Sequence, residues 1–376
     1  MQQELLPGTS FEQTDLFPAI DGLIAPRSIE RRLNGAIVVR GQLLGAAEQI
    51  YRPLRARFER LGYTPFIQEG ADGVEVVATP GVIERRPLRW KLNLALFLAT
   101  IFTVLLTGAA SEVGTADALS RIMQQPSLLL QGVPFAATLL GILFAHEMGH
   151  FIVSRLRGAP ASLPYFIPLP PGISFTGTMG AVIVQREPFE DRRTLLEVAI
   201  AGPLAGLAVA IPLLFYGLSI SEVGSPPPEV TSWIQEGNSI FYALAKFAVF
   251  GQWLPSNGVD VQLSSVAFGA WIGLLVTMLN LLPVGQLDGG HVAYALLGRR
   301  AEWISYATLV IFLALGLFVA PSWLVWTILI GLMGARHPQP FNDVTRLKPI
   351  HVVLGVIGLI AFVLLFMPTP IEQVFR

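Results

Sequence analysis

The stretch FAHEMGHF, residues 144–151, places two histidines and a glutamate inside one of the most apolar parts of the chain. On a helix, His146 and His150 are four residues apart, so both imidazoles lie on one face and can bind the same metal ion. Glu147 follows the first histidine, where its carboxylate can act as a general base without being a ligand. Ionisable groups at mid-bilayer cost about 3 kcal/mol each, so they need a cavity, a partner or a metal. The stretch therefore predicts a metal site inside a membrane.

The composition indicates an integral membrane protein. The chain has 376 residues, of which 53% are hydrophobic and 14% charged, whereas a soluble domain carries about 25% charged residues. Its net charge of -1 gives no reason to expect a nucleic-acid partner, because phosphate binding needs a clustered basic excess. The chain contains no cysteine, which excludes structural disulfides and thiolate metal sites.

Seven apolar segments predict a mainly α fold, a polytopic bundle of about seven membrane spans. A helix of about 20 apolar residues crosses the hydrocarbon of a bilayer. The last but one segment is shorter, follows Pro321, and is expected to return as one arm of a helical hairpin. The segments comprise residues 92–110, 133–156, 195–220, 264–282, 303–319, 323–333 and 350–367.

The residues before the first span predict a small soluble module. Residues 1–30 are rich in proline and lack periodicity, so they are expected to be irregular. Residues 31–88 predict an α/β module in the order βαββ, and residues 89–376 would form the transmembrane domain. The module shows no histidine cluster or phosphate loop, which favours a peripheral structural role. Its elements are strand 36–40, helix 46–61 and a hairpin of strands 63–68 and 74–78 turned at Ala71-Asp72-Gly73.

Basic residues predict how the chain crosses the membrane. Arg85, Arg86, Arg89 and Lys91 precede the first span, which by the positive-inside rule puts the N-terminal module in the cytosol. If residues 239–254 do not cross, the other basic clusters fall on the same side: Arg155, Arg157, Arg192, Arg193, Arg299, Arg300, Arg336, Arg346 and Lys348. The first 30 residues resemble neither a secretory signal nor a transit peptide, so a prokaryotic plasma membrane is the expected location.

Three further features each have two interpretations. The connection 158–193 contains many prolines and glycines and the run Val182-Ile183-Val184, which fits either a membrane-dipping β-ribbon or an ordinary loop. The pattern Gly202-Pro203-x-x-Gly206 indicates either a close helix contact or a path for water. His291 is either a partner of a metal ligand or a histidine at a helix start or at the membrane interface.

A catalytic zinc ion with two histidine ligands needs a further protein ligand at membrane depth. Asp288 is the candidate, in the stretch NLLPVGQLDGGH at residues 280–291, directly after the fourth span. There Pro283 and Gly285 break the helix, and the glycines after the aspartate allow the backbone to turn sharply. An Asp-Gly pair alone is more often a solvated turn, but the incomplete two-histidine site reverses that preference.

The two motifs together resemble the site-2 protease family of intramembrane zinc metalloproteases, over about residues 90–335. HExGH lies on one span, and Asn-x-x-Pro followed by Leu-Asp-Gly-Gly lies on a later one. The N-terminal module and span count are more loosely similar to the chloroplast and cyanobacterial branch of that family. The resemblance implies one Zn²⁺ per chain held by His146, His150 and Asp288, with Glu147 as the catalytic base. Asn280 would lie beside the site, orienting substrate or stabilising the oxyanion.

The implied function is hydrolysis of peptide bonds in or near transmembrane helices of membrane-protein substrates within the lipid bilayer, as in regulated intramembrane proteolysis. A substrate helix must unwind first, and residues 177–186 could offer it a strand edge. The alternative is a metal transporter or metal-sensing membrane protein with the same ligands, which leaves Glu147 without a role. A scaffold without catalysis is disfavoured by the same glutamate. The sequence leaves the substrate, the regulator and the oligomeric state open.

Overall fold

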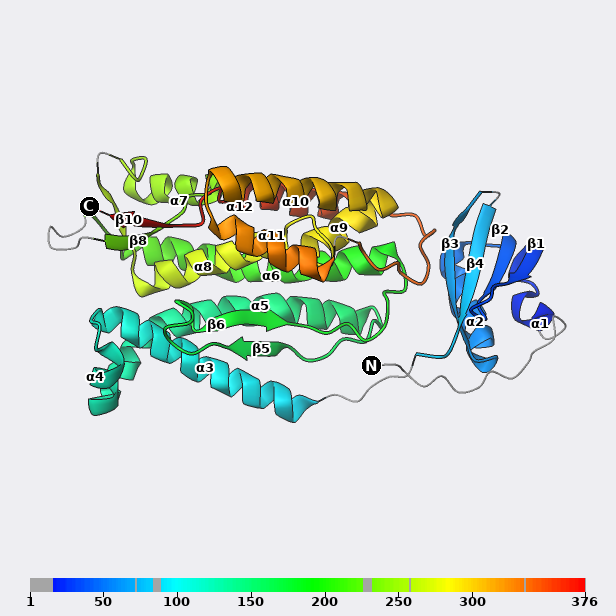
Figure 1. Cartoon of the computed structure of the whole chain (residues 1–376), viewed down its shortest axis with the longest axis horizontal. Coiled ribbons are helices and arrows are strands. Elements are labelled where there is room, and N and C mark those ends of the chain that lie inside the picture. Colours follow the sequence, from blue (N-terminus) through cyan, green and yellow to red (C-terminus); the bar gives the residue numbers. More distant parts are fainter. Residues whose placement is uncertain are drawn as a thin grey trace.

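The computed structural model describes residues 16–71, 73–83, 89–225, 232–256, 258–334 and 336–375. The chain is mainly helical, and a small sheet domain lies at one end of a bundle of long helices (Figure 1). We call this the domain end of the bundle. The opposite end, at the left of Figure 1, carries β8 (Ser232–Glu236) and β10 (Ile371–Phe375), and we call it the far end.

The N-terminal domain is a four-stranded antiparallel sheet in the order β1-β2-β4-β3, covered by one helix. That helix buries Ile50, Leu54 and Phe58, spaced four residues apart, in the core of the domain. The three predicted strands and the predicted helix occur in the expected order, but strand β1 precedes them, so the order of the domain is ββαββ and not βαββ. Asp72 of the predicted turn lies outside the described residues. The elements are α1 (Phe17–Ile20), β1 (Ile24–Arg31), β2 (Ile37–Leu43), α2 (Ala47–Arg60), β3 (Tyr63–Gly70) and β4 (Gly73–Pro80).

Strand β1 corrects the prediction that residues 1–30 are irregular. It pairs with β2 along its length, with a register shift between Pro26 and Ser28. The proline and the shift interrupt the alternation of buried and exposed residues, so the sequence pattern hides the strand. Because β1 is an edge strand, it pairs with a neighbour on one side only, so Pro26 can lie in it although proline has no backbone N–H to donate. Residues 1–15 lie outside the described residues.

All seven predicted apolar segments are helical. Of the described residues, four stretches are long and apolar enough to cross a membrane: Trp90–Val113, Pro126–Leu156, Arg192–Ser219 and Asp288–Phe318. Helices α8, α11 and α12 are shorter, so the count of seven crossings is not confirmed. The helices are α3 (Trp90–Val113), α5 (Val133–Leu156), α6 (Arg192–Ser219), α8 (Ser265–Asn280), α9 (Asp288–Leu297), α10 (Ala301–Phe318), α11 (Ser322–Met333) and α12 (Pro349–Leu365), with 3₁₀ turns at Pro126–Gly132 and Gly298–Arg300.

Glycines let the central helices approach closely. A Cβ atom on Gly149 of α5 would lie 2.5 Å from the carbonyl oxygen of Ala201 on α6. A Cβ atom on Gly217 of α6 would lie 2.3 Å from the backbone nitrogen of Ala267 on α8. Between helices in lipid, close packing of small residues replaces the hydrophobic driving force. Helix α6 is therefore held between α5 and α8.

The connection between α5 and α6 is a ribbon rather than an ordinary loop. Strands β5 (Tyr165–Pro168) and β6 (Thr178–Val182) pair antiparallel. Two polar residues of α3 fasten the ribbon: the Asn93 amide donates to the carbonyls of Leu163 and Pro164, both at 2.9 Å, and the Thr103 hydroxyl donates to the carbonyl of Gly177 at 2.7 Å. The strand begins earlier than the run Val182-Ile183-Val184 that suggested it.

Short elements close the far end. They comprise α4 (Ala118–Gln124), β7 (Glu222–Gly224), α7 (Ile240–Phe250) and β9 (Asp260–Gln262). Strand β7 pairs with β9, and β8 pairs with β10. Helix α7 has 11 residues, so it is shorter than the four stretches that could cross a membrane.

The N-terminal domain is joined to the bundle by the segment before α12. Ile67 of the edge strand β3 donates to the carbonyl of Phe341 at 2.7 Å and accepts from the amide of Asp343 at 2.9 Å. The amide of Phe341 in turn donates to the carbonyl of Phe189 at 2.9 Å. The Phe341 ring is buried in the core of the N-terminal domain, stacked on Tyr51. The segment thus bridges that domain and the chain before α6.

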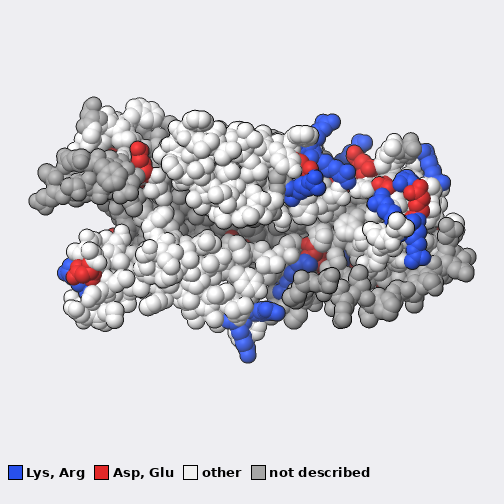
Figure 2. Space-filling view, viewed as in Figure 1, with Lys and Arg blue, Asp and Glu red and all other residues white. Residues whose placement is uncertain are grey.

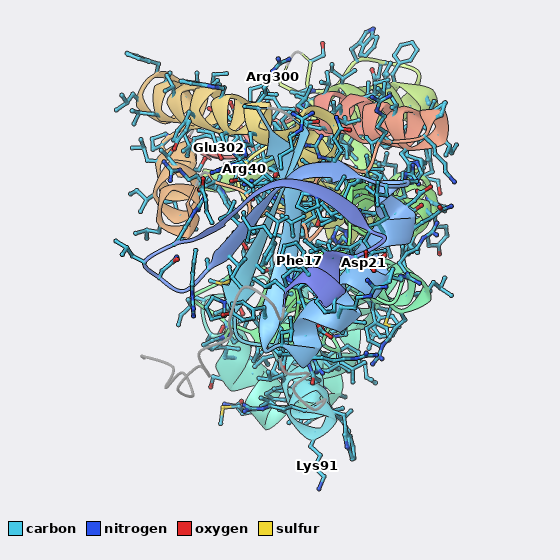
Figure 3. The ribbon with its side chains drawn as sticks, turned by 90° about the vertical axis from the view of Figure 1, so that its right-hand side faces the viewer. Phe17, Asp21, Arg40, Lys91, Arg300 and Glu302 are labelled. Carbon is cyan, nitrogen blue, oxygen red and sulfur yellow. The ribbon has the colours of Figure 1, made fainter. Side chains whose placement is uncertain are left out.

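Charged side chains gather at the domain end. On the face shown in Figure 2, the middle of the bundle is almost free of Lys, Arg, Asp and Glu. Figure 3 looks from the domain end and shows Lys91 and Arg300 at opposite edges of the molecule. Arg193 forms an ion pair with Glu48 of the N-terminal domain, and Arg299 donates to Gln68 at 2.9 Å. Arg85 and Arg86 lie outside the described residues.

Candidate metal centre

Three side chains from two helices converge inside the bundle. His146 and His150 project from α5, and Asp288 is the first residue of α9. The two Nε2 atoms are 3.2 Å apart, and Oδ2 of Asp288 lies 3.2 Å from each of them. The ligand atoms of the group all lie within 4.8 Å of one another, so the three residues could hold a metal ion.

The hydrogen bonding of His150 indicates what the group can bind. Its Nδ1 lies 2.7 Å from the carbonyl oxygen of Val198 on α6. A carbonyl only accepts, so Nδ1 carries the proton and Nε2 of the neutral ring presents a lone pair. That lone pair faces the Asp288 carboxylate, which places two electron-pair donors against each other. A second proton on the imidazole or a metal ion between the two groups resolves this arrangement, and two imidazoles with one carboxylate are a ligand set of catalytic zinc. The residues therefore fit Zn²⁺.

Glycines of α6 make room for the imidazoles. A Cβ atom on Gly202 would lie 2.1 Å from Nε2 of His150, and one on Gly206 would lie 3.3 Å from Nδ1 of His146. A side chain at the first position would displace the ring. Of the two interpretations of this glycine pattern, the structure therefore supports close packing, and the packing partners are the candidate ligands themselves.

Asp288 reaches the histidines because the chain turns sharply between α8 and α9. Gly285 has a φ of 54°, in the left-handed region that favours glycine. A Cβ atom on Gly289 would lie 1.9 Å from the carbonyl oxygen of Leu281. Helix α8 ends at Asn280 and α9 begins at Asp288, so the predicted break around Pro283 is confirmed.

The three candidate ligands line a cavity of about 620 Å³. Glu147, which is 5% exposed, and Asn280 line the same cavity. Nδ2 of Asn280 lies 3.2 Å from Nε2 of His146. The structure therefore brings all five predicted site residues to one cavity.

The opposite wall of the cavity comes from the ribbon and from the segment before α12. Residues 181–189 and 337–340 line it. Glu187 lies at the end of the ribbon, with 4% of its surface exposed, and accepts a hydrogen bond of 2.8 Å from Nη2 of Arg55 on α2. The N-terminal domain therefore contacts a residue that lines the cavity.

Two further histidines meet in this cavity, a pairing that the sequence did not predict. Nδ1 of His337 lies 2.6 Å from the carbonyl oxygen of Pro338, so it carries a proton. Nε2 of the same ring then accepts from Nδ1 of His291, 2.5 Å away. Burial, together with the neighbouring His291, lowers the pKa of His337 to about 3. His291 thus lines the cavity from the first turn of α9, but no sequence signal connects histidines 46 positions apart.

Comparison with known proteins places a family domain over this site. Residues 134–320 match the model of Peptidase family M50. The chain is 29% identical over 303 residues to "Probable zinc metalloprotease EGY1, chloroplastic" of Arabidopsis thaliana, covering 74% of this chain and 53% of the relative. It is 27% identical over 356 residues to "Probable zinc metalloprotease EGY2, chloroplastic" of the same plant, covering 90% and 61%. The rice EGY1 protein, from Oryza sativa subsp. japonica, is 28% identical over 349 residues, covering 83% and 59%. The chain thus spans between about half and three fifths of the length of these relatives.

Proposed function

Because residues 134–320 match the model of Peptidase family M50, we propose that the chain is an intramembrane zinc metalloprotease of the site-2 protease family. Its substrates would be membrane-spanning proteins, cut in or near their transmembrane helices. The observation that carries this proposal is the convergence of His146, His150 and Asp288 in a cavity that Glu147 also lines. The helices around that cavity include three of the four stretches that are long and apolar enough to cross a membrane.

The roles of the site residues follow from their chemistry. His146, His150 and Asp288 would hold one Zn²⁺, which when bound supplies a Lewis acid for the scissile carbonyl and brings the pKa of its water to about 7. Glu147 takes the proton of the attacking water and passes it to the leaving amine. The Asn280 amide lies beside His146 and can donate to the carbonyl oxygen as negative charge develops on it.

The ribbon would hold the substrate. A transmembrane helix bonds its own carbonyls, so it must unwind before a peptide bond can enter the site. In the described part of the chain, β6 pairs with β5 alone, so its second edge has no strand partner. An unwound substrate segment can add to that edge and lie beside the metal cavity, as in β-augmentation.

The experiment that tests this function compares the purified wild type with Glu147→Gln on a single-span substrate. The amide keeps the shape of the carboxylate but cannot take the proton, so cleavage should be lost while zinc stays bound. Zinc content by metal analysis is the control for folding of the site. Cleavage that survives in Glu147→Gln would rule out the mechanism.

The same pair of measurements separates the protease from a metal transporter. A transporter would lose ion flux on His146→Ala or Asp288→Ala and would cleave no peptide in any form. The described residues contain one group of three such ligands, whereas a transport path needs successive sites. We therefore retain the protease as the proposal.

The proposed orientation puts the N-terminal domain and the basic residues at the domain end on the cytosolic side. The prediction of a prokaryotic plasma membrane gains no support from the relatives, which are named as chloroplastic proteins. We propose seven crossings, with the N-terminal sheet domain followed by the transmembrane domain from about residue 89. Because the chain has no cysteine, Arg300→Cys and Arg121→Cys should react with an impermeant thiol reagent from opposite sides of a sealed membrane. Labelling of both from one side would overturn the orientation.

A further inference from the structure

The histidine pair of the metal cavity has no role in the hydrolysis described above. Both His291 and His337 line the cavity. His291 lies three residues after Asp288 in the first turn of α9, and side chains with that spacing share one face of a helix, with Cβ atoms about 5–6 Å apart. His291 is not part of the group of mutually close ligand atoms that the candidate ligands form. It therefore lies beside the metal position without being a fourth ligand.

The hydrogen bonds of the pair determine which nitrogen of His291 carries the proton. Nδ1 of His337 donates to the carbonyl of Pro338 at 2.6 Å, so Nε2 of that ring accepts from Nδ1 of His291 at 2.5 Å. In the described part of the chain, no carboxylate forms an ion pair with His291 that would favour a second proton on its ring. The ring is therefore neutral, and its Nε2 carries a lone pair.

That lone pair has no hydrogen-bond partner among the described residues. Neighbouring aromatic rings hold the pair in place. Phe189, which also lines the cavity, meets His291 edge-on with the ring centres 5.9 Å apart, and Tyr294 stacks on His337 at 4.3 Å. Since Nδ1 of His291 is bonded to His337, Nε2 is the atom of this ring that remains for a donor from outside the chain.

An unwound substrate brings donors that need such an acceptor. A segment that adds to the free edge of β6 bonds to that strand along one of its own edges, and the N–H groups of its other edge point away from β6. Inside the membrane those groups find no water, so each needs a partner from the protein. Successive residues of an extended chain advance about 3.3 Å. An N–H one or two residues from the bond at the metal is therefore about as far from it as neighbouring side chains of α9 are from each other.

We propose that Nε2 of His291 accepts a hydrogen bond from a backbone N–H of the unwound substrate, one or two residues from the cleaved bond, and that His337 holds His291 in the tautomer that can accept it. His291 is then a substrate-binding residue, and His337 is a positioning residue. The inference rests on the proposed function and deepens it, because it names what the site recognises. The donor is a backbone group because every unwound segment carries one at each residue except proline.

The tautomer is tested without substrate. In ¹⁵N spectra of zinc-loaded protein with labelled histidine, His291 should show a protonated Nδ1 and an unprotonated Nε2, and its signals are identified by their loss in His291→Asn. His337→Phe keeps a ring against Tyr294 but removes the acceptor, so it should move the proton of His291 toward Nε2. His337→Gln keeps an acceptor and should restore the wild-type spectrum. A protonated Nε2 in the wild type, or no change in His337→Phe, overturns the inference.

The contact with substrate is tested by ester replacement. Full-length Glu147→Gln protein in phosphatidylcholine nanodiscs is titrated with fluorescent single-span peptides in which one backbone N–H at a time, along the central residues, is replaced by an ester oxygen. Where the N–H bonds to β6, the ester weakens binding in every variant. At one further position it should weaken binding by about fivefold, the size of one hydrogen bond, and this loss should depend on His291.

Variants of the histidine assign that loss. Adding His291→Asn should abolish it, because the shorter amide can still donate to His337 but has no atom in the place of Nε2. Adding His291→Gln should keep it, because the longer amide can bring its carbonyl oxygen to that place. His351→Asn is the matched control, since Nε2 of His351 bonds to Glu197 at 2.9 Å and this histidine lies outside the cavity lining. The control should keep the fivefold loss.

The outcomes distinguish this inference from the proposed function. Ester losses that are the same with and without His291→Asn overturn the inference. A loss that depends on His291, in a protein whose wild type cuts none of the all-amide peptides, supports the hydrogen bond and overturns the protease. Cleavage by the wild type together with ester losses that do not depend on His291 supports the protease and overturns the inference.

Discussion

Arg55 of the N-terminal domain and Glu187 of the metal cavity are joined by a hydrogen-bonded ion pair of 2.8 Å. The guanidinium also lies over the ring of Phe341, 4.6 Å from its centre, in the segment that bridges the two parts of the chain. A domain at the end of the bundle is therefore fastened to the wall of the cavity by charge, by ring contact and by backbone hydrogen bonds.

Replacement of Arg55 by methionine should weaken this attachment. The Glu187 side chain is 3% exposed, and a buried carboxylate that loses a charged hydrogen bond destabilises the protein by roughly 2 kcal/mol. The measurement is thermal unfolding in detergent, with limited proteolysis of the N-terminal domain as a second readout. Arg52→Met is the matched control, because Arg52 pairs with Glu190 at 3.0 Å but its side chain is 73% exposed. That change should cost less than about 0.5 kcal/mol, and equal costs for the two variants would contradict the prediction.

Replacement of Gly202 by alanine should lower zinc affinity without touching a ligand. The added Cβ atom would lie 2.1 Å from Nε2 of His150, so the ring must leave the position in which it meets Asp288. Loss of correct orientation of a ligand typically costs about 10- to 100-fold in metal affinity. Zinc affinity by competition with a chelator is the measurement. Gly141→Ala on α5 is the control, since a Cβ atom there meets nothing within 4 Å. If both variants bind zinc like the wild type, the packing role assigned to Gly202 is wrong.

His337 should make stability sensitive to mild acid. Its pKa is lowered to about 3 in the folded protein, whereas an unfolded histidine has a pKa of about 6.5. Below about pH 6.5 the unfolded chain takes up a proton at this histidine, whereas the folded chain does not. The neutral histidine therefore adds its full contribution to the free energy of unfolding above about pH 6.5, and that contribution declines as the pH falls toward about 3. The unfolding temperature should therefore drop between about pH 7 and pH 5. The drop should be smaller in His337→Gln, and parallel curves for the two proteins would contradict the assignment.

The sequence predicted the features that depend on residues close to each other in the chain. Helical periodicity places His146 and His150 on one face, and Pro283 with the following glycines predicts the break that brings Asp288 to them. The helices and the order of the predicted βαββ elements depend on the same local patterns of apolar residues. Contacts between residues far apart in the sequence were not predictable, such as those of His291 with His337 and of Ile67 with Phe341. These contacts are set by tertiary packing.

Polar residues inside apolar helices could have indicated that another segment is attached to α3. Asn93 and Thr103 lie in α3, and both donate to backbone carbonyls of the ribbon. A polar side chain in a membrane helix needs a partner, because lipid offers none. Their spacing of ten positions along one helix indicates a structure fastened at two levels. Which segment supplies the carbonyls follows only from the fold, since the ribbon is about 70 residues away in the sequence.

Asn280 should act on turnover and not on metal binding. Its Nδ2 lies 3.2 Å from Nε2 of His146 and therefore beside the position of the metal. Replacement by alanine removes a donor aimed at the developing oxyanion, and loss of one such donor lowers kcat by about 10²-fold. Zinc content should remain that of the wild type, because the three ligands are unchanged. Thr277→Ala is the control one turn earlier on α8, where the hydroxyl donates to the carbonyl of Gly273 at 2.8 Å, and its kcat should stay near that of the wild type. If Asn280→Ala loses zinc in proportion to activity, the amide orients His146 instead, because a donor to the oxyanion would leave the metal in place.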